Sequence, residues 1–390
     1  MEIKCVNVYS SARISSNLSV RFCCANTHDL EIDSTTATLY DYPLDEILNC
    51  SDAKRIRQAL QQGIQDESCS ECWKNEAAGL MSKRIADNNT LRIKEKDAGL
   101  KYVELNMGST CNLKCRTCNP FSSVQWEKEY YEFMNWGDTR ENYLNYIKSH
   151  RSNNEQRNQV ISNLKGQLTT VDQIDIFGGE PFMIQDQWDI LSDLVEQGSS
   201  KNQIVKLNSN GTIYDAEKIS ILEQFKEAHI SLSIDATGKH FEYIRSMANW
   251  DSTLDNIRKF KQHVVPGKFI LNICITVSVF NVYYLPEILL FFNQLGVNSY
   301  FNIVYTPKFF AITTLPDLVT AQLKQKFLAS SGLTEYQTQQ LANLISLIEN
   351  EPSDKAQLEL MFSKINWLDN SRGESFSDTF PEFYKVITNV

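Results

Sequence analysis

The chain of 390 residues is long enough for two domains, or for one barrel-like domain with additions, and its apolar fraction of 42% is ordinary for a globular protein. A formal net charge of −10 argues against a large sequence-independent nucleic-acid surface, which clustered Lys and Arg would carry. No stretch approaches the roughly 18 consecutive apolar residues of a membrane helix, and the N-terminus lacks the apolar core of a signal peptide. We therefore expect a cytoplasmic protein without a membrane partner.

The first part of the chain is rich in cysteine. Two alternating runs at 5–9 and 18–24, joined by a polar stretch, predict a β-hairpin. Leucine and isoleucine then recur at helical spacing over 44–60, and Cys69 and Cys72 form a Cys-x2-Cys knuckle. All but one of the 10 cysteines lie within 5–118, and such clustering in a reducing compartment indicates metal binding. Residues 1–98 are predicted to be a small cysteine-rich α+β domain.

From residue 99 onward, short apolar runs alternate with helical segments. The predicted strands are 101–106, 171–177, 203–208, 230–235, 268–278 and 299–305. The predicted helices between them are 121–135, 184–197, 215–227, 251–264 and 283–295. This order predicts an α/β fold with a parallel sheet and right-handed crossovers. Six such strands would form a partial (β/α)6 TIM-like barrel over 99–314, and 315–390 is predicted to be a helical C-terminal extension that caps the barrel's open side.

Three cysteines, Cys111, Cys115 and Cys118, follow the first strand of this barrel. A four-iron cluster takes one thiolate per iron, so three cysteines leave one iron open, and an open position is what a reactive metal site needs. The spacing i, i+4, i+7 would also fit a buried stripe on a helix. Pro120 opposes that alternative because proline stops a helix.

A second motif, Gly178-Gly179-Glu180-Pro181, ends the second strand. Two glycines let a ligand approach the backbone closely, and a carboxylate can accept a hydrogen bond from a cationic amine. Polar residues also end the third and fourth strands, and they are Asn208, Asn210, Ser233 and Asp235. Functional residues of such barrels lie at the strands' C-terminal ends, although Asn, Ser and Asp also serve there simply as turn formers.

The Cys-x3-Cys-x2-Cys spacing followed by the Gly-Gly-Glu-Pro motif resembles the radical S-adenosylmethionine (SAM) superfamily. The resemblance implies that Cys111, Cys115 and Cys118 are the catalytic [4Fe-4S] ligands and that Gly178, Gly179, Glu180 and Pro181 hold the SAM amino group. It also implies that the four polar strand-end residues surround the ribose and carboxylate of SAM. Thr117 departs from the pattern, since that position is often aromatic in the family.

The activity implied by this resemblance is reductive cleavage of SAM to a 5′-deoxyadenosyl radical, which abstracts hydrogen from a substrate. The electron would come from a donor such as flavodoxin or ferredoxin. A peptide or protein is the favoured substrate, and a small molecule such as a sugar or nucleoside is the alternative. The contrasting class is a non-catalytic iron-sulfur or zinc protein, which would leave the Gly-Gly-Glu-Pro motif without a purpose.

The order of cysteines, hairpin, helix and knuckle within 1–98 resembles the SPASM or twitch domains that accompany many radical SAM enzymes. Those domains usually follow the barrel, whereas this segment precedes it. The resemblance implies a second, fully ligated [4Fe-4S] cluster held by Cys5, by Cys23 or Cys24, and by Cys69 and Cys72. Zinc is a rival for the same thiolates because four-cysteine knuckles also bind zinc, and a site without metal is the remaining alternative.

Overall fold

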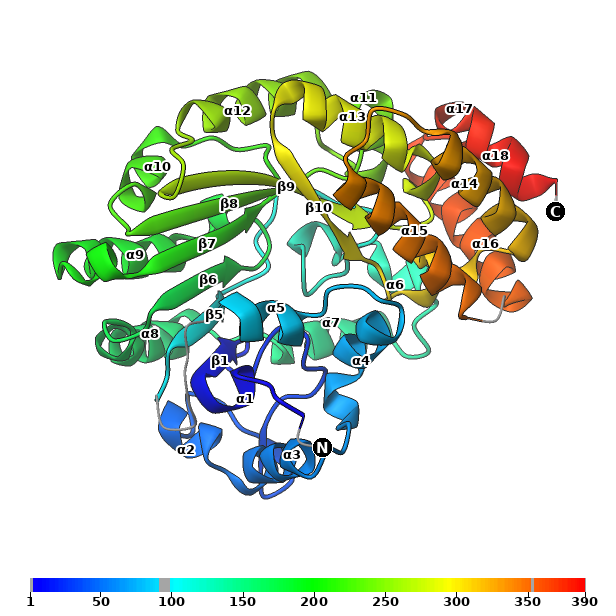
Figure 1. The fold of residues 1–390 in the computed structure, drawn as a ribbon. Helices are drawn as coiled ribbons and strands as arrows, with labels where there is room; N and C mark the ends of the chain where they lie inside the picture. Colours follow the sequence, from blue (N-terminus) through cyan, green and yellow to red (C-terminus); the bar gives the residue numbers. More distant parts are fainter. Residues whose placement is uncertain (1–2, 91–98, 352–353, 390) are drawn as a thin grey trace.

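The fold is built around one curved sheet (Figure 1), and the computed structural model describes residues 3–90, 99–351 and 354–389. Eight strands pair in the order β10-β9-β8-β7-β6-β5-β1-β2. Their bounds are β1 (Ser11–Ile14), β2 (Val20–Arg21), β5 (Tyr102–Asn106), β6 (Gln173–Phe177), β7 (Ile204–Ser209), β8 (Glu227–Ser233), β9 (Phe269–Val277) and β10 (Asn298–Ile303). From β5 to β10 all neighbours run parallel, which confirms the predicted parallel α/β core.

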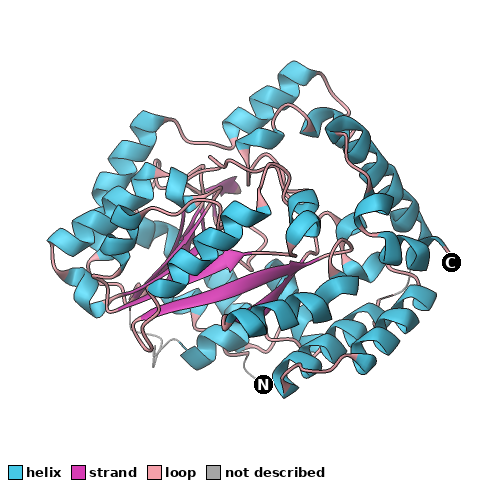
Figure 2. Ribbon diagram, turned by 90° about the horizontal axis from the view of Figure 1, so that it is seen from above, coloured by secondary structure: helices cyan, strands magenta, loops and turns pink. Residues whose placement is uncertain are grey.

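Helices cover the outer face of this sheet, as Figures 1 and 2 show. They are α8 (Asn154–Leu168), α9 (Gln185–Glu196), α10 (Ala216–Leu222), α12 (Trp250–Gln262) and α13 (Leu285–Leu295). Successive strand residues point to opposite faces, so Val103 and Leu105 of β5 join the apolar core while Tyr102 and Glu104 point the other way. Helix α10 is shorter than the predicted helix at 215–227, because β8 has already begun at the end of that range.

The strand predicted at 5–9 is wrong. That segment forms the short helix α1 (Asn7–Ser10), and β1 begins only at Ser11. The side-chain amide of Asn7 donates a 2.9 Å hydrogen bond to the Asp87 carboxylate, which lies 80 positions away in the sequence. The Ser11 hydroxyl donates to the backbone carbonyl of Asn7. Local alternation of apolar residues carries no information about a partner so distant in the chain.

The hairpin itself exists, and it extends the barrel sheet. β1 pairs antiparallel with β2 and parallel with β5, with Arg13 opposite Glu104. A separate two-stranded ribbon follows, formed by β3 (Glu31–Ile32) and β4 (Thr35–Thr36). The N-terminal segment thus shares a sheet with the barrel, and the predicted boundary at residue 98 lies outside the described residues.

Further helices of the N-terminal segment follow, and the last two of them bridge the open side of the barrel (Figure 1). In chain order they are α2 (Leu44–Leu48), α3 (Ser51–Gln61), α4 (Ser70–Ala77) and α5 (Lys83–Thr90). Lys83 of α5 donates a 2.7 Å hydrogen bond to the Tyr102 hydroxyl of β5. Tyr305, just after β10, donates to Asn75 of α4. Helix α5 therefore contacts the first barrel strand, and helix α4 contacts the segment just after the last one (Figure 1).

The helix predicted at 121–135 is wrong in its length. The chain there forms a 3-10 turn at Val124–Trp126 and a single helical turn, α6 (Tyr130–Phe133). The Ser123 hydroxyl donates to the Leu113 carbonyl, and the Trp126 indole donates to the Cys115 carbonyl at 2.8 Å. These tertiary bonds to the cysteine loop hold the segment in a compact turn.

The remaining helices include those of the C-terminal extension, which lie together on one side of the barrel (Figure 1). They are α7 (Arg140–Ser149), α11 (Gly238–Ile244), α14 (Asp317–Ala329), α15 (Glu335–Glu349), α16 (Lys355–Arg372), α17 (Phe376–Thr379) and α18 (Pro381–Thr388). Over the described part of the chain, none of the helices combines the length and apolar character required to cross a bilayer.

Candidate active site

The three cysteines after β5 lie on an irregular loop and gather in one small apolar cluster with Leu113 and Ala248. Cys111 and Cys115 are only 7% and 5% exposed, and Cys118 is half-buried. The helical-stripe alternative is therefore wrong, because the loop contains no helical turn between the first and the last cysteine. The three cysteines instead lie on a loop whose fold brings their side chains into one cluster.

Cys115 has the most acidic thiol of the three. Its pKa is lowered to about 7 by a hydrogen bond from Cys118 and by the Arg245 guanidinium, although burial acts in the opposite direction. The Arg245 Nη1 atom lies 3.7 Å from the Cys115 sulfur. Burial raises the pKa of the Cys111 thiol to about 11. A thiolate is the form that binds metal, so the cation beside Cys115 favours the ligating form of that residue.

The Gly-Gly turn after β6 is docked directly on the cysteine loop. Gly179 donates a 2.9 Å backbone hydrogen bond to the Gly108 carbonyl, and Glu180 donates one of 2.8 Å to the Thr110 carbonyl. A Cβ atom on Gly179 would lie 2.2 Å from the Thr110 oxygen, and Gly178 has a φ of +126°. Only glycine fits this approach at both positions.

The Glu180 carboxylate is fully buried and links neighbouring strand ends. Oε1 accepts hydrogen bonds from the Ser209 hydroxyl at 2.9 Å and the Phe182 backbone amide at 3.1 Å. Oε2 accepts one from the Asn210 backbone amide at 2.7 Å. Burial raises the pKa of this carboxyl, while the three donors act against that shift. In this structure Glu180 organises the loops at the ends of β6 and β7, and its oxygens already have protein partners.

We expect the Glu180→Gln variant to lose about 1–3 kcal/mol of unfolding free energy, since an amide group would face donors that now meet a carboxylate oxygen. Chemical denaturation of both proteins measures the loss. Glu196→Gln, at an exposed position on α9, is the matched control and should stay within about 0.5 kcal/mol of the wild type. Equal stability of the Glu180→Gln variant and the wild type would contradict the role assigned to this carboxylate.

The predicted strand-end residues do not all play the same part. The side-chain amide nitrogen of Asn210 donates to the Asn112 side chain at 2.9 Å and lies 3.8 Å from the Cys111 sulfur. Asp235 is 2% exposed, accepts from the Thr276 amide and pairs with Arg245 at 2.9 Å. Asn208 and Ser233 are half-buried. The structure therefore brings Asn210 and, through Arg245, Asp235 to the cysteine loop.

Sequence reasoning missed Arg245, Ser209 and Asn106. Arg245 follows helix α11 without any motif that points to it. Ser209 lies between two predicted site residues, so its position in the polar run at the end of β7 was an available signal. The Asn106 Oδ1 atom is buried at the end of β5 and has no hydrogen-bond partner in the described part of the chain. It would lie 3.0 Å from a Cβ on Gly178, so it points at the Gly-Gly turn.

These residues fit a cluster and a ligand with a cationic amine. In the described residues, no set of three or more His, Cys, Asp or Glu side chains is arranged to hold one ion. A four-iron cluster instead takes each thiolate on a different iron. The unpartnered Asn106 oxygen supplies an acceptor beside the Gly-Gly turn and the cysteine loop.

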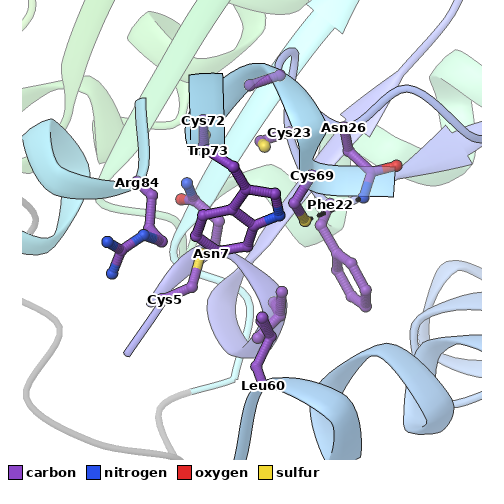
Figure 3. Close-up of a pocket in the computed structure, with 12 residues that line it drawn as sticks. Cys5, Asn7, Phe22, Cys23, Asn26, Leu60, Cys69, Cys72, Trp73 and Arg84 are labelled. Atoms are coloured by element: carbon purple, nitrogen blue, oxygen red, sulfur yellow. Dashed lines mark hydrogen bonds between the residues drawn. The ribbon is translucent and has the colours of Figure 1, made fainter. Parts of the chain in front are cut away.

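A second group of cysteines lies in the N-terminal segment. Cys5, Cys23, Cys69 and Cys72 line one small cavity. Figure 3 shows them around the indole of Trp73. Burial raises the pKa of Cys5 to about 12 and that of Cys69 to about 11.

Cys24 does not line this cavity. Cys24 is exposed, and its thiol lies instead near Glu104 and Lys83. Cys24 begins the turn that follows Cys23, and of this pair only Cys23 lines the cavity with the other three cysteines.

Comparison with known proteins gives one family match. Residues 105–281 match the family model described as the radical SAM superfamily. No curated protein shows significant similarity to the chain.

Several solved structures are similar in part. anSMEcpe with bound AdoMet is 16% identical, with 58% of this chain and 59% of that chain covered and a TM-score of 0.41. Streptococcus suis SuiB bound to S-adenosylmethionine is 16% identical, with coverage of 84% and 69% and a TM-score of 0.36. TYW1 with a lysine-pyruvate adduct is 15% identical, with coverage of 57% and 70% and a TM-score of 0.31. The chain thus spans 59% of the length of the first of these structures.

Proposed function

Because residues 105–281 match the radical SAM family model, we propose that this chain is an enzyme that cleaves SAM reductively and uses the product to abstract hydrogen from a substrate. The observation that carries the proposal is the Gly178-Gly179 turn docked by two backbone hydrogen bonds on a loop with three gathered thiols. A [4Fe-4S] cluster on those thiols would supply the electron that splits SAM into methionine and a 5′-deoxyadenosyl radical.

Each part of the site has a role in this proposal. Cys111, Cys115 and Cys118 would hold three irons, and the fourth would face SAM. The Asn106 oxygen and the backbone of the Gly-Gly turn would receive the amino group, with Glu180 and Pro181 fixing the turn's shape. Arg245 is the buried cation beside the cysteines, and its positive charge would match the negative charge of the SAM carboxylate. The polar strand-end residues Asn208, Asn210, Ser233 and Asp235 would surround the remainder of SAM.

The test is anaerobic reconstitution with iron and sulfide, followed by incubation with SAM and dithionite. We expect 5′-deoxyadenosine and methionine to form in equal amounts. If a protein with its full complement of iron forms neither, the proposed activity is wrong, and the non-catalytic iron-sulfur or zinc protein becomes the better interpretation.

We also propose a second [4Fe-4S] cluster in the N-terminal segment, held by Cys5, Cys23, Cys69 and Cys72. Four thiols that converge on one cavity from three separate segments support it, because a fully ligated cluster takes four thiolates. Zinc remains the rival for the same thiolates. The segment's contacts with β5 and β10 would place this cluster beside the barrel's open side, as expected for a SPASM-like or twitch-like auxiliary domain.

Iron counting separates Cys23 from its neighbour. Wild-type protein should bind about eight irons per chain, and Cys23→Ser should bind about four, because one cluster loses a ligand. Cys24→Ser is the matched control and should keep about eight, since its thiol lies outside the cavity. Equal iron in all three proteins would contradict the assignment, and about four irons with one zinc in the wild type would favour the zinc alternative.

For the substrate we propose a peptide or protein, with an electron donor of the flavodoxin or ferredoxin class. Proteomic comparison of cells with and without the active enzyme would reveal a mass change on a peptide. A change confined to sugars or nucleosides would instead favour the small-molecule alternative.

A further inference from the structure

The cysteine loop is also held from the C-terminal side of the chain. Arg116 lies between Cys115 and Cys118, and its side chain is 0% exposed. Its Nη2 atom donates a 2.6 Å hydrogen bond to Asp369 of α16 and another to Glu374, just beyond that helix. Its Nε atom donates to the Tyr243 carbonyl at 2.9 Å. A loop residue thus reaches carboxylates that lie more than 250 positions later in the sequence.

Both carboxylate oxygens of Asp369 accept hydrogen bonds. Oδ1 accepts from Arg116 and from the Tyr243 hydroxyl at 2.7 Å, and Oδ2 accepts from the Phe376 amide at 2.7 Å. The Arg116 guanidinium also lies 3.5 Å from the centre of the Tyr243 ring. Stacking on an aromatic ring and bonding to carboxylates use the planar form of arginine, which lysine cannot replace.

A second arginine makes the reverse contact. Arg372, in the last turn of α16, donates to the Lys114 carbonyl at 3.1 Å and to the Ser246 hydroxyl at 2.8 Å. It also pairs with Glu129 at 3.2 Å. Gly373 then adopts a left-handed φ of 66°, which ends the helix. This turn brings Glu374 back toward Arg116.

The two contacts bracket Cys115, because one acts on the residue before it and the other on the residue after it. Backbone bonds add to them, since Lys114 donates to the Ser246 carbonyl and Arg116 to the Ile244 carbonyl. Charges buried in such a network are stable only while every partner is present. Residues 369–374 therefore contact the loop on both sides of Cys115.

We propose that residues 369–374, the end of α16 and the turn after it, are a positioning element that sets the place of Cys115 before a cluster binds. Arg116, Asp369, Arg372 and Glu374 are its positioning residues. The C-terminal extension, which packs beside the barrel, then also contributes residues that position the metal site. This inference rests on the proposed function in taking the loop as the site of a cluster. The contacts between residues 369–374 and the loop are present in the chain without a cluster.

The test is hydrogen exchange, followed by mass spectrometry, on the full-length apoprotein prepared without oxygen. In the Asp369→Asn/Glu374→Gln double variant we expect amides of 111–118 to exchange at least about tenfold faster, since each hydrogen bond to a charged group stabilises the closed loop by about that factor or more. Glu349→Gln removes an exposed carboxylate that pairs with Lys324 in the same extension. In that control we expect exchange over 111–118 to be unchanged.

A second readout separates positioning from general stability. After reconstitution, the electron paramagnetic resonance spectrum of the reduced cluster, compared at equal iron content, should change in the double variant and stay unchanged in Glu349→Gln. If the double variant does not fold, Glu374→Gln alone decides, because that side chain is 27% exposed.

Wild-type exchange over 111–118 together with a wild-type spectrum would overturn the proposal. A wild-type protein that fails to cleave SAM would overturn the proposed function, and the exchange result on the apoprotein would still stand.

Discussion

Cys115→Ala is expected to abolish 5′-deoxyadenosine formation, with a loss of more than about 100-fold, because even residues that only support metal ligands cost up to that factor when they are replaced. The thiol removed is the one whose pKa is lowered to about 7, and it lies at the centre of the loop. Product formation from SAM and dithionite, measured at equal protein concentration, gives the result.

Cys50→Ser is the matched control for this variant. Cys50 caps α3, where its side chain accepts a hydrogen bond from the Ala53 amide at 3.4 Å, and serine can make the same bond. We expect full activity and full iron content. Wild-type activity in Cys115→Ala, with its secondary structure retained, would show that the three-cysteine loop is not the active metal site.

Gly179→Ala should be nearly as damaging. The added Cβ would lie 2.2 Å from the Thr110 carbonyl oxygen, so the turn and the cysteine loop must separate. Overpacking of this kind costs about 1–3 kcal/mol of unfolding free energy. A displacement of about 1 Å between reacting groups lowers the rate by about 100-fold. Thermal unfolding and 5′-deoxyadenosine formation measure the two effects separately.

Gly166→Ala tests whether the effect belongs to the site rather than to the loss of a glycine. Gly166 lies within α8, and a Cβ there would meet no atom within 4 Å. Alanine in a helix is favoured over glycine by about 0.5–1 kcal/mol, so this variant should be slightly more stable and fully active. Equal behaviour of the two alanine variants would contradict the close approach described for Gly179.

Much of the barrel was predictable because its signals are local. Each buried strand carries a short apolar run, and each crossover helix carries its own periodicity, so the six parallel strands followed from windows of about 5–15 residues. The helix at 121–135 failed for a related reason. Its sequence is compatible with a helix, but bonds from Ser123 and Trp126 to the cysteine loop hold a tight turn instead.

The site divides in the same way. Cys111, Cys115, Cys118 and the Gly-Gly turn are short motifs at strand ends, and their spacing pointed to metal and ligand binding. Nothing in the sequence near Arg245 or Arg372 indicates that these side chains reach the cysteine loop, because each contact joins residues more than 120 positions apart. Such pairs become neighbours only when the sheet and the C-terminal helices pack together.

The sequence by itself determined the order of the six parallel strands and of most helices between them, and it predicts a metal site at the three cysteines, because periodicity and motif spacing act over a few residues. Only the tertiary structure decided that Cys23 rather than Cys24 faces the other N-terminal cysteines, that β1 extends the barrel sheet, and that α16 holds Arg116. The physical reason is that a side chain's direction and its distant partners depend on the packing of the whole chain, and burial makes each such partner obligatory for a charged or polar group.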